Sequence, residues 1–387
     1  MEVEGKRALV RVDFNVPLDI KTGAISDDSR IRAVLPTIKY LVERKAKVII
    51  CSHLGRPDGQ VVEGLRMAPV AQRLSQLMKL PVSTASDCIG ADVEKAVNNL
   101  KPGNILLLEN LRFHAEEEAN DPSFARALAK LADIYVDDAF GTAHRAHAST
   151  VGVAKYLPAV AGFLMEKELK VLGSLLTSPG HPFVALLGGA KVSDKIGLIQ
   201  NVLGKVDLLL IGGGMAATFL KAQGYEVGLS LVEDDKQSLA QELIETAKRN
   251  GGALLLPTDV VVANNISAEA KGEVVGVGNI PANKSIVDIG PRTIEKFSQQ
   301  MKQCRTVFWN GPMGVYEIHQ FSGGTKAMAE LLASLKATTI VGGGSTAEIV
   351  EEMNLANKMT HVSTGGGASL KFLEGKSLPG VAVLPDK

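Results

Sequence analysis

Four times in the second half of the chain, a short apolar run ends in glycines and a helical pattern begins. The runs are 183–187, 207–211, 338–341 and 361–364, and the glycines stand at 188–189, 212–214, 342–344 and 365–367. Each run with its helical pattern predicts a βα unit, and successive βα units build a parallel sheet with helices on both faces. Glycine at such a turn lets a ligand approach the backbone and leaves the first N–H groups of the helix free for an anion. One turn of this kind is explained by tight packing alone, whereas four favour a phosphate or nucleotide site.

The first half alternates strand candidates with amphipathic stretches. The strand candidates are 7–12, 47–51, 105–108 and 134–136, and the helical patterns are 29–45, 68–78, 92–98 and 122–132. In the first helical pattern, Ile31, Val34 and Ile38 share one stripe, which is the spacing of a helix packed on a sheet. The first half is therefore also predicted to be an α/β domain.

The length and the charge balance restrict the class of protein further. A chain of 387 residues exceeds the roughly 250–300 residues of a single core, so two domains are expected. Lysine and arginine total 42, equal to the 42 acids, so no net field favours nucleic acid or a membrane surface. No apolar run of about 18 residues is present, and the N-terminal MEVEGKR lacks the apolar core of a signal peptide.

The cysteines point to a reducing compartment. Cys51, Cys88 and Cys304 are odd in number and form no CxxC pair, which argues against a disulfide framework and against a cysteine-based zinc site. We therefore expect a cytoplasmic protein.

Polar and charged side chains follow the strand candidates of the first half. They are Asp13, Asn15, His53, Arg56, Glu109, Arg112, His114, Asp137, Asp138, His144, Arg145 and His147. Guanidinium groups bind carboxylate and phosphate through two parallel hydrogen bonds. Any one of these residues is explained by a surface or capping role, but their grouping at successive strand ends predicts a site for a small, multiply anionic substrate.

Two lysines follow the first glycine turn of the second half. Lys191 and Lys195 have i, i+4 spacing, which predicts one shared helix face and contact with phosphate, the alternative being a solvated basic face. The sequence contains no GxxxxGK[ST], no HRD with DFG and no GxSxG. Residues 212–217 fit the GxGxxG/A pattern, so the alternative that the protein is a dinucleotide-dependent dehydrogenase stays open. The acidic residue that this pattern requires about 20 positions further on is not clear.

These residues give the chain a close resemblance to the phosphoglycerate kinases over essentially its full length. The matching stretches are RVDFNVP (11–17), SHLGRPDG (52–59), LLENLRFH (107–114), DDAFGTAHRAH (137–147), LLGGAKVSDK (186–195), IGGGMAATFL (211–220), WNGPMGVYE (309–317) and HVSTGGGASL (361–370). The resemblance implies two Rossmann-like three-layer α/β domains with parallel sheets facing a central cleft, joined by a hinge helix. We expect a 3-phosphoglycerate-binding domain at 1–165, on which the tail 378–387 packs back, and a nucleotide-binding domain at 166–377.

The same resemblance implies which residues serve each substrate. Those that would hold 3-phosphoglycerate are Asp13, Phe14, Asn15, Arg30, His53, Leu54, Gly55, Arg56, Arg112 and Arg145. Those that would hold the nucleotide are Lys191, Lys195, Gly213, Gly214, Gly290, Asn310, Pro312, Glu317, Gly343, Gly344, Ser345 and Thr346. The groups implied to act on the moving phosphoryl are Arg30, Lys191, Gly343 and Gly366.

The implied reaction is reversible phosphoryl transfer between 1,3-bisphosphoglycerate with ADP and 3-phosphoglycerate with ATP, a step of glycolysis. The acceptor carboxylate is ionised at pH 7, so no general base is needed, and direct in-line transfer depends on positioning, on charge neutralisation and on Mg²⁺. Domain closure would exclude water from the transfer. We expect a monomer whose only partners are these small molecules.

One residue departs from the family pattern. After the glycines at 342–344 the family usually has an aspartate that binds the magnesium of the nucleotide, but this chain has Ser345. A hydroxyl is a weaker ligand for a hard dication than a carboxylate, so we expect weaker metal-nucleotide affinity or replacement by Glu348 or Asp194. Ser345 is also the only support for a non-catalytic binding protein, against which the retained cations Arg30, Lys191 and Lys195 argue.

Overall fold

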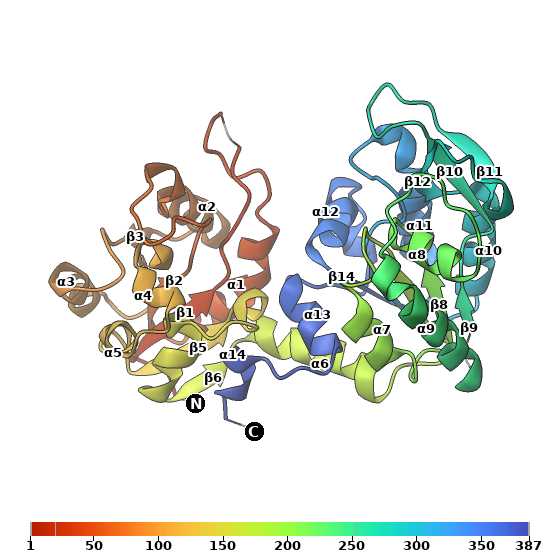
Figure 1. The fold of residues 1–387 in the computed structure, drawn as a ribbon. Coiled ribbons are helices and arrows are strands. Elements are labelled where there is room, and N and C mark those ends of the chain that lie inside the picture. The colour runs from red at the N-terminus through yellow and green to blue at the C-terminus, as the bar shows by residue number, and fades with distance from the viewer. Residues whose placement is uncertain (1, 20, 252, 386–387) are drawn as a thin grey trace. The chain divides into compact units, whose positions relative to one another are not determined.

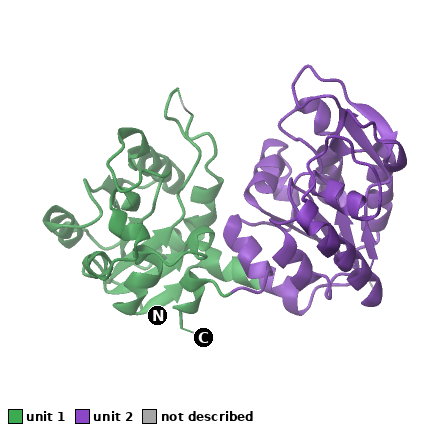
Figure 2. Ribbon diagram, in the orientation of Figure 1, with its two compact units in different colours: residues 1–170, 377–387 green, residues 171–376 purple. Residues whose placement is uncertain are grey.

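A computed structural model describes residues 2–19, 21–251 and 253–385. The chain forms two compact units, one of residues 1–170 with 377–387 and the other of residues 171–376 (Figure 2). The boundary expected at 165/166 and the boundary between the units both fall in the helix α6 (Phe163–Thr177). We call the two units the first and the second unit, and each is described by itself.

The first unit is built on a six-stranded parallel sheet with the strand order β3-β4-β2-β1-β5-β6 (Figure 1). The strands are β1 (Arg7–Val12), β2 (Lys47–Cys51), β3 (Val82–Thr84), β4 (Ile105–Leu107), β5 (Ile134–Asp138) and β6 (Ala159–Ala161). Val10 and Ile50 belong to one buried cluster, whereas Leu9 and Ile49 belong to another. Successive residues of a strand point to opposite faces, so both faces of this sheet are covered, which explains the continuous apolar runs.

Helices supply the other side of both clusters. They are α1 (Ser29–Glu43), α2 (Ala68–Met78), α3 (Ala91–Asn99), α4 (Ala115–Glu118), α5 (Pro122–Ala129) and α14 (Pro379–Ala382). Short helical turns are η1 (Glu63–Leu65), η2 (Leu111–Phe113), η3 (Phe140–Thr142), η4 (Ala148–Gly152) and η5 (Val153–Lys155). Ile38 of α1 and Leu74 of α2 pack in the first cluster, and Val97 of α3 and Leu128 of α5 pack in the second.

The C-terminal segment lies on the first unit. The N–H of Gly380 donates to the carbonyl of Ala143 at 2.9 Å, and Leu384 packs against the second cluster. Residues 386 and 387, the last two of the expected tail, lie outside the described residues.

The sequence prediction missed part of this unit. The edge strands β3 and β6 have only three residues each and were not predicted, because so short a run shows no periodicity. The prediction that Asp137 and Asp138 follow a strand was wrong: both lie inside β5 and both are buried. Asp137 accepts the N–H of Ala139 and Asp138 accepts the N–H of Met165, each at 3.0 Å, but the Oδ2 atom of each is buried without a partner among the described residues. Burial accordingly raises the pKa of Asp137 to about 7 and that of Asp138 to about 6.

The second unit has a six-stranded parallel sheet with the order β15-β14-β13-β7-β8-β9 and a separate antiparallel sheet with the order β11-β10-β12. The parallel strands are β7 (Phe183–Leu187), β8 (Leu208–Ile211), β9 (Ala253–Leu255), β13 (Thr306–Asn310), β14 (Thr338–Gly342) and β15 (His361–Val362). The antiparallel strands, which the sequence did not predict, are β10 (Asp259–Ala263), β11 (Glu273–Gly276) and β12 (Ser285–Ile289).

The helices of this unit follow the strands, as the glycine turns predicted. They are α7 (Ile196–Val202), α8 (Met215–Ala222), α9 (Gln237–Arg249), α10 (Pro291–Met301), α11 (Gly323–Ser334), α12 (Gly344–Glu352) and α13 (Gly367–Leu373). Short turns are η6 (Asp234–Lys236), η7 (Val277–Asn279), η8 (His319–Phe321) and η9 (Ala356–Lys358). The predicted fold class, two α/β units with parallel sheets, is confirmed.

One local prediction was wrong. Lys191 and Lys195 do not share a helix face, because α7 begins only at Ile196. Residues 190–195 form a turn instead, in which the N–H of Lys195 donates to Val192 at 2.8 Å and the N–H of Ser193 donates to the Glu233 carboxylate at 3.0 Å. Contacts made by backbone groups in a turn of this kind leave no periodic signal.

Within the part of the chain that the structure describes, no helix combines the length and the hydrophobicity that a membrane span requires.

Replacing Phe297 by alanine should destabilise the second unit by about 3–5 kcal/mol, because the ring is fully buried in the cluster that contains Trp309. Urea unfolding followed by the fluorescence of Trp309 measures this. Leu229→Ala, at a side chain that is 64% exposed, is the matched control and should change the free energy of unfolding by less than about 0.5 kcal/mol. Equal effects of the two variants would contradict the packing described.

Candidate functional site

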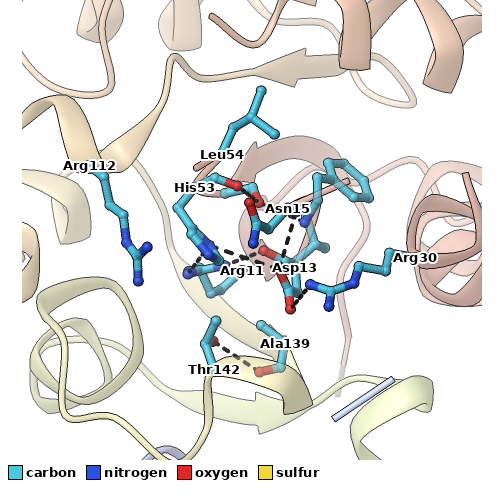
Figure 3. A network of polar contacts seen from close by, with 12 residues as sticks. Arg11, Asp13, Asn15, Arg30, His53, Leu54, Arg112, Ala139 and Thr142 are labelled. Atoms are coloured by element: carbon cyan, nitrogen blue, oxygen red, sulfur yellow. Dashed lines mark hydrogen bonds and ion pairs between the residues drawn. The ribbon is translucent and has the colours of Figure 1, made fainter. Parts of the chain in front are cut away.

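The segment after β1 supplies the centre of a polar site on the first unit (Figure 3). Asp13 Oδ2 accepts a hydrogen bond from Arg30 Nη1 at 2.9 Å, and Asp13 Oδ1 lies 3.9 Å from His53 Nδ1. The N–H of Asn15 donates to Asp13 Oδ1 at 3.2 Å. Parallel strands end at one edge of their sheet, so residues after β1 and β2 meet there although about 40 residues separate them. The structure therefore brings together four of the predicted substrate residues.

Two further hydrogen bonds fix the loop after β2 against the loop after β1. The N–H of Phe14 donates to Ser52 Oγ at 2.8 Å, and the N–H of Gly55 donates to Asn15 Oδ1 at 2.8 Å. Phe14 and Leu54 are buried among apolar side chains. These two predicted site residues therefore position the loops rather than present side chains to a ligand, whereas Arg56 is exposed.

Arg112 enters the site from η2, which follows β4. The side chain of Asn110 caps this turn by accepting the N–H of Arg112 at 3.1 Å. The Arg112 guanidinium donates to the carbonyl of Gly55 at 2.9 Å and pairs with Glu118 at 3.1 Å. Its Nε is a buried donor with no hydrogen-bond partner among the described residues. A buried unsatisfied donor costs free energy, and an anionic ligand is the group that would satisfy this one.

The electrostatics of the site are strongly positive. Burial lowers the pKa of His53 well below its usual range, and the charges of Arg11, Arg112, Arg30 and Arg145 lower it further. Burial, followed by Arg11, Arg112, Arg145 and His144, likewise lowers the pKa of His147 to about 4. Both imidazoles are neutral near pH 7 because protonation would add charge to a cluster of guanidinium groups.

Sequence reasoning missed Arg11. It lies within β1, between β2 and β5, and only 1% of the residue is exposed. Its Nε donates to Ser149 Oγ at 2.8 Å, Nη2 lies 3.3 Å from His53 Nδ1, and Nη1 contacts the carbonyl of Val12. A basic residue in the otherwise apolar strand run was the available signal, since a charge buried in a sheet needs partners.

In the second unit, three glycine-containing turns interlock. The N–H of Gly189 donates to the carbonyl of Pro312 at 2.9 Å, and the N–H of Gly213 donates to Met313 at 3.0 Å. A Cβ on Gly213, whose φ is +66°, would lie 2.6 Å from the backbone N of Gly189. The turns after β7, β8 and β13 can approach this closely only because glycine stands there.

Lys195 is the most perturbed cation of the second unit. Its Nζ contacts Asn310 Oδ1, and burial lowers its pKa to about 8, against the attraction of Asp194 and Glu374. Asn310 Nδ2 is a buried donor without a partner among the described residues. Lys191, by contrast, is exposed. An ammonium and an amide that are both buried and incompletely paired fit a site that receives anionic oxygens.

A cavity of about 380 Å³ adjoins the start of α12. It is lined by Pro312, Tyr316, Glu317, His319, Ser322, Lys326, Ser345, Glu348, Ile349 and Glu352. Three predicted nucleotide residues, Pro312, Glu317 and Ser345, thus share one cavity with a Pro, a Tyr and an Ile side chain. The lining combines the apolar surfaces of Pro312 and Ile349 with mainly polar and charged side chains, so it offers a nucleoside both packing surface and hydrogen-bonding groups.

The other predicted residues divide between backbone and support. Gly343 and Gly366, with φ of +91° and +50°, are the N-cap residues of α12 and α13. Gly344 and Gly366 have open space where a Cβ would point, so a ligand can reach their backbone. Thr346 is buried and accepts the N–H of Gly311 at 2.7 Å, which makes it a support. Gly214 and Gly290 pack closely, Gly214 against Ala190 and Gly290 against the Asp259 carboxylate, and neither lines the cavity.

A cluster of arginines in one α/β unit and a buried lysine beside glycine turns in another are the parts of a phosphotransferase with a small anionic substrate. The sequence profile of the family described as phosphoglycerate kinase matches residues 1–376. The chain belongs to the phosphoglycerate kinase family, and the predicted resemblance is confirmed. The reaction of this family is the phosphotransfer to a carboxyl group expected from the sequence, a step of glycolysis.

Relatives resemble the chain over nearly its whole length. The phosphoglycerate kinase of Moorella thermoacetica is 58% identical, with 100% of this chain and 98% of the relative covered. That of Dictyoglomus turgidum is 56% identical, with 100% and 97% covered. The solved structure of the Coxiella burnetii enzyme superimposes with a TM-score of 0.86 at 44% identity, covering 99% of this chain and 96% of that one. The Pyrococcus horikoshii structure has a TM-score of 0.86 at 34% identity, covering 99% and 97%.

The contribution of His147 to the free energy of unfolding should fall as the pH drops from about 6.5 toward 4, opposite in sign to the contributions of the buried Asp137, Asp138 and Asp288, whose pKa values burial raises. The folded pKa of His147, about 4, lies below its ordinary 6.5, so the unfolded chain binds more protons in that window. In His147→Gln this loss should be absent, which urea titrations at several pH values measure, with the values above pH 6.5 as reference. An unchanged pH dependence in the variant would contradict the lowered pKa of His147, which comes first from burial and then from the neighbouring arginines.

Proposed function

We propose that this chain performs the family's reaction with the acceptor bound on the first unit and the nucleotide on the second. The observation that carries the assignment is the pair of incompletely satisfied buried donors, Arg112 Nε in one unit and Asn310 Nδ2 in the other. Each lies among cations in a different polar site, so each site is suited to an anion. The ten residues expected to hold 3-phosphoglycerate lie in the first unit, and the twelve expected to hold the nucleotide lie in the second.

On the first unit, Arg112 and Arg145 are suited to the phosphate of 3-phosphoglycerate. Both contact the Glu118 carboxylate, at 3.1 and 4.0 Å, and the ligand would replace that partner. Asp13 would accept a hydrogen bond from the substrate hydroxyl, and the Asn15 side-chain amide, whose oxygen already accepts the N–H of Gly55, would donate to the substrate carboxylate. Arg30, whose side chain is 33% exposed, is held by Asp13 and would reach the transferring phosphoryl.

On the second unit, Lys195 and the glycine turns are suited to the nucleotide phosphates. Helix N-termini at Gly343 and Gly366 would offer N–H groups to them. Lys191 lies exposed in the turn formed by residues 190–195 and would neutralise negative charge on the phosphoryl group during its transfer. The nucleoside would occupy the cavity next to α12, with Glu317 on the ribose hydroxyls.

The chemistry needs no proton transfer. The acceptor is an ionised carboxylate, so catalysis consists of bringing it into line with the γ-phosphate and neutralising charge with Arg30 and Lys191. Because the two substrates would bind on different units, direct transfer requires the units to close around both of them, with α6 as the hinge element. Solution scattering that is identical with and without both ligands would contradict this closure.

Magnesium is the metal that the donor set fits. Ser345 stands one helical turn before Glu348, and both line the cavity that also contains Glu317, so hydroxyl and carboxylate oxygens are available to a hard dication. We propose that Ser345 and Glu348 hold Mg²⁺ together with the nucleotide phosphates. The ion would supply neutralisation of phosphate charge. Asp194, the other candidate, does not line this cavity.

We further propose that the protein works as a monomer in the cytoplasm. The balanced charge, the odd number of cysteines and the small-molecule character of both substrates support this.

The direct test of the function is magnesium-dependent ATP consumption with 3-phosphoglycerate, coupled to the reduction of 1,3-bisphosphoglycerate. Turnover that requires both ATP and 3-phosphoglycerate is expected. ATP binding without turnover would instead favour the non-catalytic alternative. Stabilisation by NADH but not by ATP would favour the dehydrogenase.

Arg30→Ala should lower kcat by roughly 100-fold or more, because it removes a cation assigned to the transition state. Arg32→Ala is the matched control on the same helix, since Arg32 is exposed and pairs only with Asp28 at 2.7 Å among the described residues. The control should keep activity within about twofold, because exposed ion pairs contribute little. Equal losses in both variants would remove Arg30 from the mechanism.

Ser345→Asp should tighten Mg²⁺-dependent ADP binding by roughly tenfold, because a carboxylate is a stronger ligand for a hard cation. Glu348→Gln should weaken the same binding, if Glu348 provides the carboxylate that Ser345 lacks. Calorimetric titration of ADP with and without Mg²⁺ measures both effects apart from turnover. Identical Mg²⁺ dependence in the wild type and both variants would show that phosphates and water alone hold the ion.

A further inference from the structure

We propose that Asp87, Cys88 and His114 form a binding site for a borderline transition metal such as Zn²⁺, outside the residues assigned to either substrate. A carboxylate oxygen, the Cys88 sulfur and a ring nitrogen of His114 all lie within 4.8 Å of one another. The closest pair, His114 Nε2 and Asp87 Oδ1, is 2.7 Å apart. Three different ligand types therefore converge on one point of the first unit.

The topology of the sheet explains the convergence. β3 and β4 are neighbouring parallel strands, and Asp87 and Cys88 follow β3 while His114 follows β4. The N–H of Glu109 donates to the carbonyl of Asp87 at 3.3 Å, which ties the two loops together. His114 ends η2, whose start is capped by Asn110. The ligands thus stand on anchored segments, as a metal site requires.

The donor set selects the class of metal. Thiolate sulfur and imidazole nitrogen suit Zn²⁺ or Co²⁺, whereas Mg²⁺ prefers oxygen only. Two ligand atoms on one tetrahedral zinc are roughly 3.3–3.8 Å apart, given metal–ligand distances of roughly 2.0–2.3 Å. The three ligand atoms lie within 4.8 Å of one another and the His114–Asp87 pair is 2.7 Å apart, so binding an ion requires this pair to separate and the thiol to approach. Three protein ligands would leave the fourth position to water.

One ligand of the site is buried, and the other two are partly exposed to solvent. Cys88 is fully buried, whereas the side chains of Asp87 and His114 are 47% and 26% exposed, so an ion has a path from solvent. Burial, and then the charge of Asp87, raises the pKa of the Cys88 thiol, which keeps its proton when no metal is bound. On binding, the S–H bond breaks, the sulfur–metal bond forms, and the thiol proton leaves to solvent. The hydrogen bond between His114 Nε2 and Asp87 Oδ1 is exchanged for bonds to the metal, and the imidazole proton moves from Nε2 to Nδ1 so that the Nε2 lone pair can bind the ion.

A similar pair elsewhere shows what distinguishes this cluster. His181 Nδ1 lies 2.6 Å from Asp207 in the second unit, but no third ligand group accompanies this pair among the described residues. A histidine–carboxylate contact alone is an ordinary ion pair, so the convergence of the buried thiol is what assigns a metal to the first cluster. Spacing motifs could not find the site, because its ligands come from two separate loops.

Cobalt provides the test, because thiolate-bound Co²⁺ has a near-ultraviolet charge-transfer band and tetrahedral Co²⁺ has intense visible bands. Titration of the full chain, treated with chelator and free of nucleotide, should saturate at one Co²⁺, and Zn²⁺ should abolish the bands. Cys88→Ser should lose the charge-transfer band. Cys304→Ser, which changes a thiol of the second unit, is the matched control and should keep it.

Cys88 is buried, so Cys88→Ser can disturb folding, and a second variant is therefore needed. His114→Gln serves this purpose because the His114 side chain is partly exposed. This variant should weaken Zn²⁺ binding by at least roughly tenfold in calorimetry, with an unchanged far-ultraviolet circular dichroism spectrum. His181→Gln should leave the affinity unchanged. The absence of a charge-transfer band in the wild type, or its persistence in Cys88→Ser, would overturn the proposal.

Discussion

The buried guanidinium of Arg11 is the interaction on which the site of the first unit depends. It lies in a central strand and contacts Ser149 at 2.8 Å and His53 at 3.3 Å, and Ser149 in turn donates to the buried Glu117 at 2.5 Å. A charge inside a sheet is stable only with such partners. These contacts therefore connect β1, the loop after β2 and η4 around the Arg11 guanidinium. The strand-end residues that we propose to bind the anionic substrate are positioned by these contacts.

The candidate phosphate site of the second unit is formed mainly by backbone groups, whereas that of the first unit is formed by guanidinium groups. Its turns after β7, β8 and β13 are hydrogen-bonded to one another through Gly189 and Gly213. Any residue with a Cβ atom at Gly213 would push these turns apart. Close turns place several N–H groups and the buried Lys195 in one region. Under the proposed function, the two units would bind their anionic ligands by different chemistry on the same kind of parallel sheet, with guanidinium groups in the first and mainly backbone N–H groups in the second.

Sequence reasoning reached the fold class and the strand-end positions, because long apolar runs and glycine turns are local signals. It failed where the signal was short or came from distant contacts. The three-residue strands β3 and β6 have no periodicity, and the turn at 190–195 depends on a hydrogen bond to Glu233. Arg11 was missed because its partners come from other elements, and the supporting roles of Phe14, Leu54 and Thr346 appear only when burial is known.

We propose that the two substrates bind on different units, and hydrogen exchange read by mass spectrometry distinguishes this arrangement from binding on one unit. With 3-phosphoglycerate alone, protection should increase in peptides that contain residues 13–15, 53–56 and 110–113. With ADP and Mg²⁺ alone, it should increase in peptides that contain residues 188–191, 212–215 and 343–346. Protection of the same unit by both ligands, or of neither unit by one of them, would contradict the account.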